Sequence, residues 1–432
     1  MTVKVSVAQR RGRLVARQLF GPGGAAGVGG TGGAEACAWG NGFAGVAGVA
    51  GVAEALVALH ATDPVTVYLS AWARSGCSVR DVDAALYDGR SLVRMLGMRR
   101  TVFVVPAGIA GTVQAGCTDD VAARLRRALE KDLAKGGVGD GDAGGWLREV
   151  EAGVLRVLAA RGGGATGAQL SGDEPRLRTQ LVYAEGKAYG GPANITSRVL
   201  TLISAEGRMI RGHRRGGWSS GQFEWFLPEV WLEHAEGTPA AAGRAADPGL
   251  GAGLDAVAAR AELARRWLAV FGPAPVSDLQ WWGGWNGAQT KAALAALPVC
   301  EVDLDGQAGV ALAGDLDFPD DPAAGGRPAA ALLPGLDPTP MGWQARDWFL
   351  GPHAPLLFDR TGNIGPTVWW AGRVVGGWAQ RPSGEVTGRL LEDIGADGAA
   401  AVAAEAARLG SWLGDARVTP RFRTPLEREL SA

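Results

Sequence analysis

The sequence contains few of the residues that bind metals or cross-link chains. Its 432 residues include four cysteines, at positions 37, 77, 117 and 300, and four histidines. The cysteines form no Cys-x-x-Cys pair, and the spacing of histidines, cysteines and carboxylates is not typical of a metal site. We therefore expect no metal, no cofactor and no disulfide framework, and we place the protein in a reducing cytoplasm.

Long apolar runs and an export signal are also missing. Residues 1–20 lack an apolar core followed by a cleavage site, and no later run of 18 or more residues is apolar. We therefore expect no membrane partner. Apolar residues make up 47% and charged residues 20% of the chain, which is ordinary for a globular protein. The length predicts several domains, each of roughly 100 to 200 residues.

Lysine is scarce, with 5 residues against 38 arginines, and the net charge is −1. That average conceals three basic segments, because positive residues gather within 1–20, 88–100 and 184–226. Such segments predict either a phosphate-facing surface on an otherwise acidic body or solvated helix and hairpin surfaces.

Three segments share one order of predicted elements, at residues 78–105, 194–226 and 286–313. Each has a stretch with helical periodicity, then a turn, then two short strand-like runs. A helix, a glycine break and a second helix precede the second and third segments. This order is the winged-helix plan, which is typical of DNA-binding modules and also serves in protein-binding modules.

The ends of several helices are also predicted. Asp81, or Ser78 before it, can cap a helix in the first segment, and Ser277 can cap one before the third. Thr196 or Ser197 can begin a helix that ends at Gly207. The inward apolar positions of the first helix are expected to be Val82, Leu86, Leu92 and Val93, and those of the second are Val199, Leu200 and Ile203.

These elements predict an α+β fold with three tandem winged-helix modules and a small β-rich, barrel-like C-terminal domain. The modules are expected at 1–140, 141–236 and 254–316, and the C-terminal domain at 327–432. A Gly/Ala-rich insertion at 21–52 interrupts the first module. Gly-containing turns at 371–373 and 382–384 separate strands of the last domain, and a helix at about 398–413 closes it.

The chain resembles the AlkZ/YcaQ-like winged-helix DNA glycosylases over nearly its whole length. The resemblance is carried by "VALHATDP" (57–64), "RSLVRMLGMRRTVFVV" (90–105), "SRVLTLISAEGRMIRG" (197–212) and "LLPGLDPTPMGWQARDWFLG" (332–351). It implies a bacterial, metal-independent enzyme whose modules surround duplex DNA in a C shape. It also implies excision of alkylated bases, including bulky and crosslinked guanine adducts.

The family's catalytic motif is Gln, any residue, then Gln or Asp, at the end of a helix in the first module. The matching residues here are His60, Ala61 and Thr62, followed by Asp63, so both functional positions depart from the motif. A neutral imidazole at His60 can position or deprotonate water, Thr62 can hold that water, and Asp63 can stabilise cationic charge on the sugar. Alternatively, Asp63 caps the helix that Pro64 begins, and His60 packs at a helix end.

Two hairpins supply candidate DNA contacts. The resemblance and the basic charge together indicate Arg94, Arg99 and Arg100 near the first hairpin, and Arg208, Arg211, His213, Arg214 and Arg215 on the second. A solvated hairpin is the alternative in each case. Trp281, Trp282, Trp285, Trp369 and Trp370 can stack on bases, although core packing explains them as well.

The function expected from these residues is that of a monofunctional DNA glycosylase. It would act as a monomer on double-stranded DNA with alkylated bases, such as N7-alkylguanine or a crosslinked base. The alternatives are a non-catalytic DNA-binding regulator or damage-recognition factor, and a winged-helix scaffold for protein partners.

Overall fold

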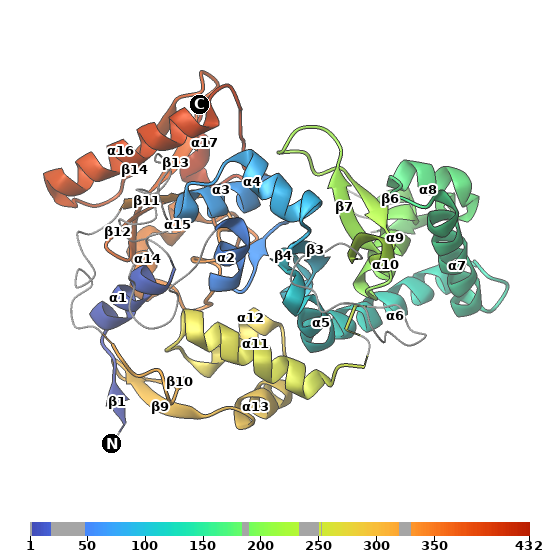
Figure 1. The fold of residues 1–432 in the computed structure, drawn as a ribbon, viewed down its shortest axis with the longest axis horizontal. Helices are drawn as coiled ribbons and strands as arrows, with labels where there is room; N and C mark the ends of the chain where they lie inside the picture. The colour runs from blue at the N-terminus through green and yellow to red at the C-terminus, as the bar shows by residue number, and fades with distance from the viewer. Residues whose placement is uncertain (1, 19–47, 184–189, 233–249, 252, 319–329) are drawn as a thin grey trace. The chain divides into compact units, whose positions relative to one another are not determined.

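The computed structural model describes residues 2–18, 48–183, 190–232, 250–251, 253–318 and 330–432 (Figure 1). Helices and sheets are mixed along the chain, as the α+β prediction requires. The residues form two compact units. Unit 1 consists of Met1–Ala85, Phe103–Pro106 and Ala261–Ala432, and unit 2 of Leu86–Val102 and Ala107–Arg260. No helix in the described ranges is long and apolar enough to cross a membrane.

In the region predicted as the first module, helix α2 (Gly48–Ala55) is followed by strand β2 (Leu59–His60) and helix α3 (Pro64–Ser75). β2 pairs antiparallel with β4 (Val102–Pro106). Residues 48–52 therefore belong to a helix and not to the predicted insertion, because Val49 and Val52 bury their side chains in the core. Residues 21–47 of that insertion lie outside the described residues.

Helix α4 (Val79–Asp83) begins at Ser78, whose hydroxyl accepts from the backbone N–H of Asp81 as predicted. The helix continues as a π-helical turn to Asp88 and stops there. Leu92 and Val93 were expected on this helix, but they open strand β3 (Leu92–Leu96). The prediction fails because Arg90 takes a left-handed conformation, with φ of 50°, which ends the helical path.

The region predicted as the third module consists of α11 (Ala256–Phe271), α12 (Val276–Gly283), α13 (Gly287–Ala295) and the hairpin of β9 (Val299–Leu304) and β10 (Gln307–Leu312). Ser277 does not cap α12, because the helix already begins after Pro275 and places Ser277 in its first turn. Strand β1 (Val3–Lys4) adds to this sheet in parallel beside β9.

Helix α1 (Val7–Arg17) uses its basic side chains within unit 1. Arg13 and Arg17 form ion pairs with Asp315. Arg11 donates from Nε to the carbonyl of Trp348 at 2.8 Å, and the Arg10 guanidinium lies 4.1 Å from the centre of the Trp348 ring. The four arginines of this helix are therefore engaged in contacts inside the unit, whereas Lys4 of β1 is exposed.

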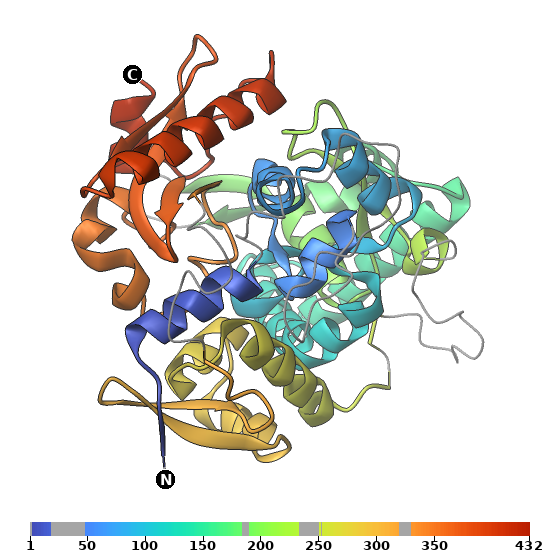
Figure 2. The same cartoon turned by 60° about the vertical axis from the view of Figure 1, so that its left-hand side comes forward.

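The C-terminal part of unit 1 is an antiparallel sheet of β11 (Ala330–Leu333), β12 (Thr367–Trp370), β13 (Arg373–Gln380) and β14 (Val386–Leu390), in that order. Left-handed residues at 371, 372 and 384 form the predicted turns. Helix α16 (Gly395–Leu413) lies along the sheet (Figure 2). The described sheet ends at β11 and β14, so the expected barrel-like closure is not found. The short helices α14 (Asp347–Leu350), α15 (Ala354–Leu357) and α17 (Pro425–Leu430) were not predicted.

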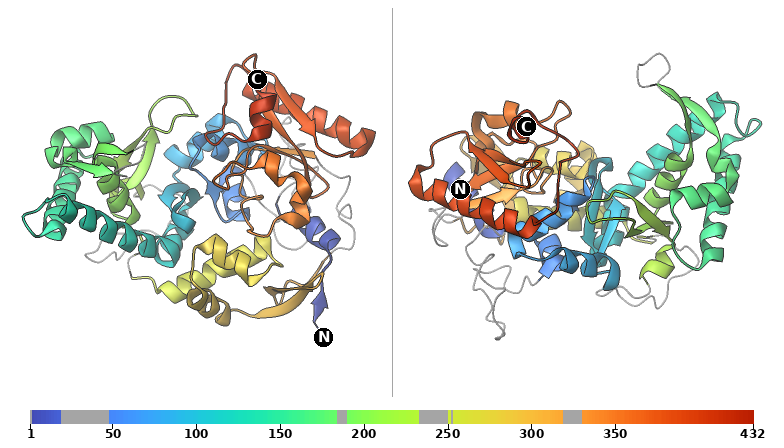
Figure 3. Two further views of the ribbon diagram at one scale, coloured as in Figure 1. Left: turned by 180° about the vertical axis from the view of Figure 1, so that it is seen from behind. Right: turned by 90° about the horizontal axis from the view of Figure 1, so that it is seen from above.

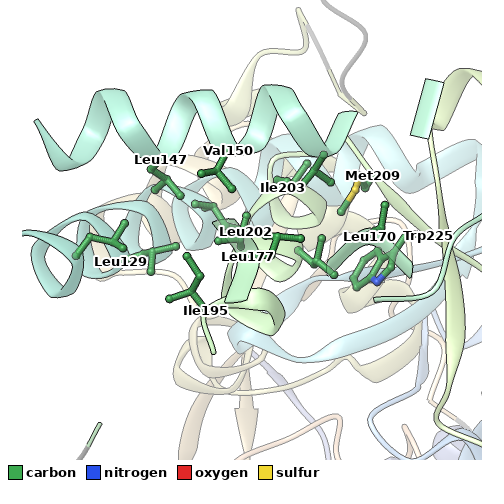
Figure 4. Close-up of a cluster of buried hydrophobic side chains, with 14 of the residues drawn as sticks. Leu129, Leu147, Val150, Leu170, Leu177, Ile195, Leu202, Ile203, Met209 and Trp225 are labelled. Carbon is green, nitrogen blue, oxygen red and sulfur yellow. The ribbon is translucent and has the colours of Figure 1, made fainter. Parts of the chain in front are cut away.

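Unit 2 contains the second segment (Figure 3). Its helices include α6 (Asp119–Lys135), α7 (Ala143–Arg161), α8 (Gly167–Asp173), α9 (Thr196–Ala205) and α10 (Pro228–Leu232). Its strands include β5 (Gln180–Tyr183), β6 (Gly191–Asn194) and the hairpin of β7 (Ile210–Arg214) and β8 (Phe223–Phe226), and β7 also pairs with β3. Side chains of α6, α7, α8 and α9 and of Trp225 pack into one core (Figure 4). α9 begins at Thr196 and buries its three predicted apolar positions, and Gly207 follows it with φ of 71°.

The three regions predicted as modules share a pairing that the sequence pattern did not reveal. In each, at least one residue ahead of the second helix pairs antiparallel with the last strand of the hairpin. The pairs are Leu59 with Val104, Ala165 with Trp225, and Ala274 with Val310.

Candidate functional site

His60 lies in strand β2. The resemblance had implied a position at the end of a helix. Helix α2 ends at Ala55, and Val57 then takes a left-handed conformation with φ of 66° before the chain straightens to pair with β4. His60 is the register partner of Phe103, whose ring meets the imidazole edge-on at 5.3 Å between centroids. Only 5% of His60 is exposed, so backbone pairing and ring packing hold the imidazole in one place.

Thr62 is partly exposed, directly before the helix that follows β2. Its carbonyl accepts a hydrogen bond from Nη1 of Arg421 at 3.2 Å. Its hydroxyl makes no hydrogen bond within the described part of the chain. That hydroxyl is therefore available to hold a water molecule or a ligand atom.

Asp63 is the N-cap of α3. One carboxylate oxygen accepts from the backbone N–H of Val65 at 3.2 Å, and the other accepts from the backbone N–H of Arg421 at 2.8 Å. Burial raises the pKa of the Asp63 carboxyl, although these two hydrogen bonds oppose the shift. Asp63 also borders a cavity of about 20 Å³ that has room for one water molecule. The hydrogen bonds of Asp63 therefore match the alternative in which this residue caps the helix that Pro64 begins.

We expect Asp63→Asn to lower the free energy of unfolding by about 1–3 kcal/mol. Each carboxylate oxygen of Asp63 now accepts from one backbone N–H. An asparagine replaces one of these oxygens with an NH₂ group, which cannot accept, so one buried N–H donor loses its partner. Asp142→Asn is the matched control, because Asp142 caps α7 through a single exposed hydrogen bond to Gly145. An asparagine oxygen can replace that bond. Urea denaturation of both variants measures the difference. If Asp63→Asn unfolds like the wild type and loses base release, the carboxylate is catalytic and not structural.

Helix α3 is clamped by a buried ion pair that sequence reasoning missed. Arg74 and Asp337 lie 2.7 Å apart, and both side chains are 0% exposed. Asp337 also accepts from the Ser70 hydroxyl at 2.6 Å and from the backbone N–H of Thr339 at 2.9 Å. The segment "LLPGLDPTPMGW", which carried part of the resemblance, therefore positions the helix that follows His60. An aspartate within an apolar, proline-rich stretch was the available signal.

Two of the predicted DNA contacts are neutralised by carboxylates. Arg208 donates to Glu151 at 3.0 Å and to Glu206 at 3.3 Å. Arg215 lies 2.9 Å from Glu224. Each of these arginines would have to leave its carboxylate, or share it, to contact a phosphate.

His213 and Arg214 lie against aromatic rings. The His213 ring lies 5.5 Å from Tyr87, 5.7 Å from Phe226 and 4.9 Å from Trp231, between centroids. Burial, together with the charge of Arg90, lowers the pKa of His213, which favours its neutral form. Arg214 lies 5.7 Å from the centre of the Tyr87 ring.

Arg99 and Arg100 form the turn between β3 and β4. Both take left-handed conformations, with φ of 53° and 60°, and the backbone N–H of Gly97 closes the turn by donating to Thr101 at 2.8 Å. Arg100 is exposed and has no ion pair in the described ranges. The remaining candidates, Arg94 and Arg211, are buried register partners on β3 and β7.

The other candidate groups pack in the interior or have no metal-binding arrangement. Trp282, Trp285 and Trp369 are buried, as core packing requires, and Trp281 and Trp370 are partly buried. Cys77 and Cys117 are buried, Cys300 is partly buried, and Cys37 lies outside the described residues. Within the described ranges, no three His, Cys, Asp or Glu side chains are grouped to hold a metal ion.

Comparison with known proteins agrees with this architecture. The model of the family "DNA glycosylase AlkZ-like" matches residues 53–412. The structure of the Streptomyces sahachiroi DNA glycosylase AlkZ is similar, with a TM-score of 0.62 and 18% sequence identity, over 95% of this chain and 98% of that chain. No curated protein sequence matches. Because the family model covers most of the sequence, the chain belongs to the AlkZ-like DNA glycosylase family.

Proposed function

We propose that this protein is a monofunctional DNA glycosylase that hydrolyses the N-glycosidic bond of alkylated bases in duplex DNA, such as N7-alkylguanine or a crosslinked guanine. The observation that carries the proposal is the place of His60. By the sequence resemblance it matches the family's catalytic position, and packing against Phe103 fixes it two residues before a free Thr62 hydroxyl. We also propose that the three helix, bridge, helix and hairpin segments are winged-helix modules that bind the duplex as a monomer.

The chemistry asked of His60 is modest. Cleavage of the bond from the sugar to a cationic alkylated base sends the bonding electrons to the base, which leaves neutral, and positive charge develops on the sugar. A water molecule then attacks the anomeric carbon, and a neutral imidazole can accept its proton. In this proposal His60 accepts that proton and Thr62 orients the water. Asp63 is a positioning residue, because it joins the end of this segment to α3 and to Arg421.

We expect Thr62→Val to lower the rate of base release about tenfold, which corresponds to the loss of one water-orienting hydrogen bond. The free energy of unfolding should stay within about 0.5 kcal/mol of the wild type, because the hydroxyl makes no hydrogen bond inside the described protein. Thr66→Val is the matched control. Its hydroxyl donates to the carbonyl of Gly335 at 2.7 Å, so its loss should reduce stability instead. A Thr62→Val rate equal to that of the wild type would remove Thr62 from the proposal.

The experiment that tests the function uses two duplexes, one with a single 7-methylguanine and one with a bulkier N7-alkylguanine. After incubation with the protein, alkali cleaves the strand wherever a base has been released. Strand scission at the lesion supports the glycosylase. A second candidate, a non-catalytic DNA-binding protein, is favoured by the departure from the family motif at both His60 and Thr62. Tight duplex binding without scission of either substrate would select it.

A further inference from the structure

Two arginines face each other across neighbouring strands of unit 2. Arg94 on β3 is the register partner of Arg211 on β7. Directly opposite residues in an antiparallel pair project from the same face of a sheet, with Cβ atoms about 5 Å apart. The two residues are 6% and 9% exposed, so both guanidinium groups lie almost wholly beneath the surface.

Neither arginine has an acidic partner in the described part of the chain. Nε of Arg94 and Nη1 of Arg211 are buried and have no hydrogen-bond acceptor. Arg211 lies over two aromatic rings, 5.1 Å from the centre of Trp225 and 5.3 Å from that of Phe223. Burial, and then the charge of Arg94, lowers the pKa of Arg211 to about 10, so it remains a cation at pH 7.

This arrangement is unfavourable for the protein alone. Like charges directly opposite each other destabilise a sheet, and a buried cation without a partner carries a desolvation penalty. Two other buried arginines do not share this problem, because Arg74 pairs with Asp337 and Arg13 pairs with Asp315. An anion from outside the described chain would balance both charges at once. Guanidinium groups match phosphate oxygens in geometry, and two of them can hold one phosphate between them.

We propose that Arg94 and Arg211 together bind a single phosphodiester group of the DNA backbone. The inference rests on the proposed function for its choice of ligand. The position supports a strand of DNA over a free anion, because β3 leads directly into the exposed Arg100 turn. The pair also differs from Arg208 and Arg215, because carboxylates of unit 2 already balance the charges of those two arginines.

The direct test replaces one phosphate at a time with an uncharged methylphosphonate in a duplex that contains one 7-methylguanine. For the wild-type protein, one position should lower the affinity about tenfold or more. For the variant Arg94→Met/Arg211→Met, the same position should have no effect, because the group that recognises its charge is gone. The slope of the logarithm of the binding constant against the logarithm of the salt concentration should also become shallower by about 0.9 in the variant, which is the value for the loss of one phosphate contact and not of two.

A second measurement, of the melting temperature with and without inorganic phosphate, tests the site in the absence of DNA. The double variant should melt at the same temperature as the wild type or higher, since it removes buried repulsion. Inorganic phosphate should raise the melting temperature of the wild type and not that of the variant. Arg127→Met is the control, because Arg127 is an exposed arginine of α6 and its loss should leave both the phosphate effect and the sensitive DNA position unchanged.

Each outcome decides between the possibilities. If phosphate stabilises the protein through the two arginines and no methylphosphonate position depends on them, the site takes a free anion and the DNA assignment is wrong. A double variant that melts lower and shows no phosphate effect overturns the site altogether. A single dependent phosphate without base release from the same duplex supports this inference while the glycosylase proposal fails.

Discussion

Asp337→Asn is expected to lower the free energy of unfolding of unit 1 by about 3–5 kcal/mol. The substitution leaves the Arg74 guanidinium buried at 0% exposure without a counter-charge. The two oxygens of Asp337 now accept hydrogen bonds from Ser70, Thr339 and Arg74. The substitution replaces one of these oxygens with a donating NH₂ group. The loss is large because a buried charge that loses its partner keeps the full penalty of leaving water. Urea unfolding followed by tryptophan fluorescence measures it.

Two controls separate this effect from a general loss of charge. Arg389 and Glu429 lie at the same distance, 2.7 Å, but their side chains are 42% and 55% exposed. Glu429→Gln should therefore cost less than about 1 kcal/mol. Replacing both partners, as Arg74→Met/Asp337→Leu, should cost less than Asp337→Asn alone, because no unpaired charge remains. An Asp337→Asn variant as stable as Glu429→Gln would contradict the buried clamp.

The local elements were largely predictable from the sequence, because capping residues and apolar periodicity act over a few positions. Ser78 caps α4, α9 begins at Thr196 and ends before Gly207, and the turns near 371 and 384 lie where their glycines indicate. The error at Leu92 and Val93 has the same local origin. An apolar run can continue a helix or open a strand, and the left-handed Arg90 that decides between them carries no distinctive sequence signal.

Contacts between distant parts of the chain were not predictable. The backbone N–H of Arg421 reaches Asp63 across 358 positions, and Asp337 reaches Arg74 across 263. Arg94 and Arg211 were both candidates for DNA contact, but only the strand register places them opposite each other. The strand at His60 was unpredictable for the same reason. Its two residues form a strand only because β4, which is distant in the sequence, lies beside them. Periodicity contains no information about such partners.

His60→Ala is expected to slow base release from 7-methylguanine DNA by about 100-fold to 10,000-fold, the range for the loss of a general base. The reason is geometric as well as chemical, because Phe103 and the β2 to β4 pairing hold the imidazole in one orientation. Affinity for the duplex should change little, since the buried imidazole packs against Phe103 and is not among the charged side chains proposed to contact phosphates. His60→Gln is the matched control. It introduces the residue that the family motif has at this position, and an amide can still orient water.

The measurement that tests the central claim most directly is single-turnover base release by the wild type, His60→Ala and His60→Gln, with duplex affinity measured for each. We expect alkali-sensitive strand scission with the wild type, a loss of about 100-fold or more in His60→Ala, and an intermediate rate in His60→Gln, whose amide can orient water but accepts no proton, all at unchanged affinity. Equal rates for the wild type and a folded His60→Ala variant would contradict the assignment of His60. No scission with any of the three would contradict the glycosylase itself.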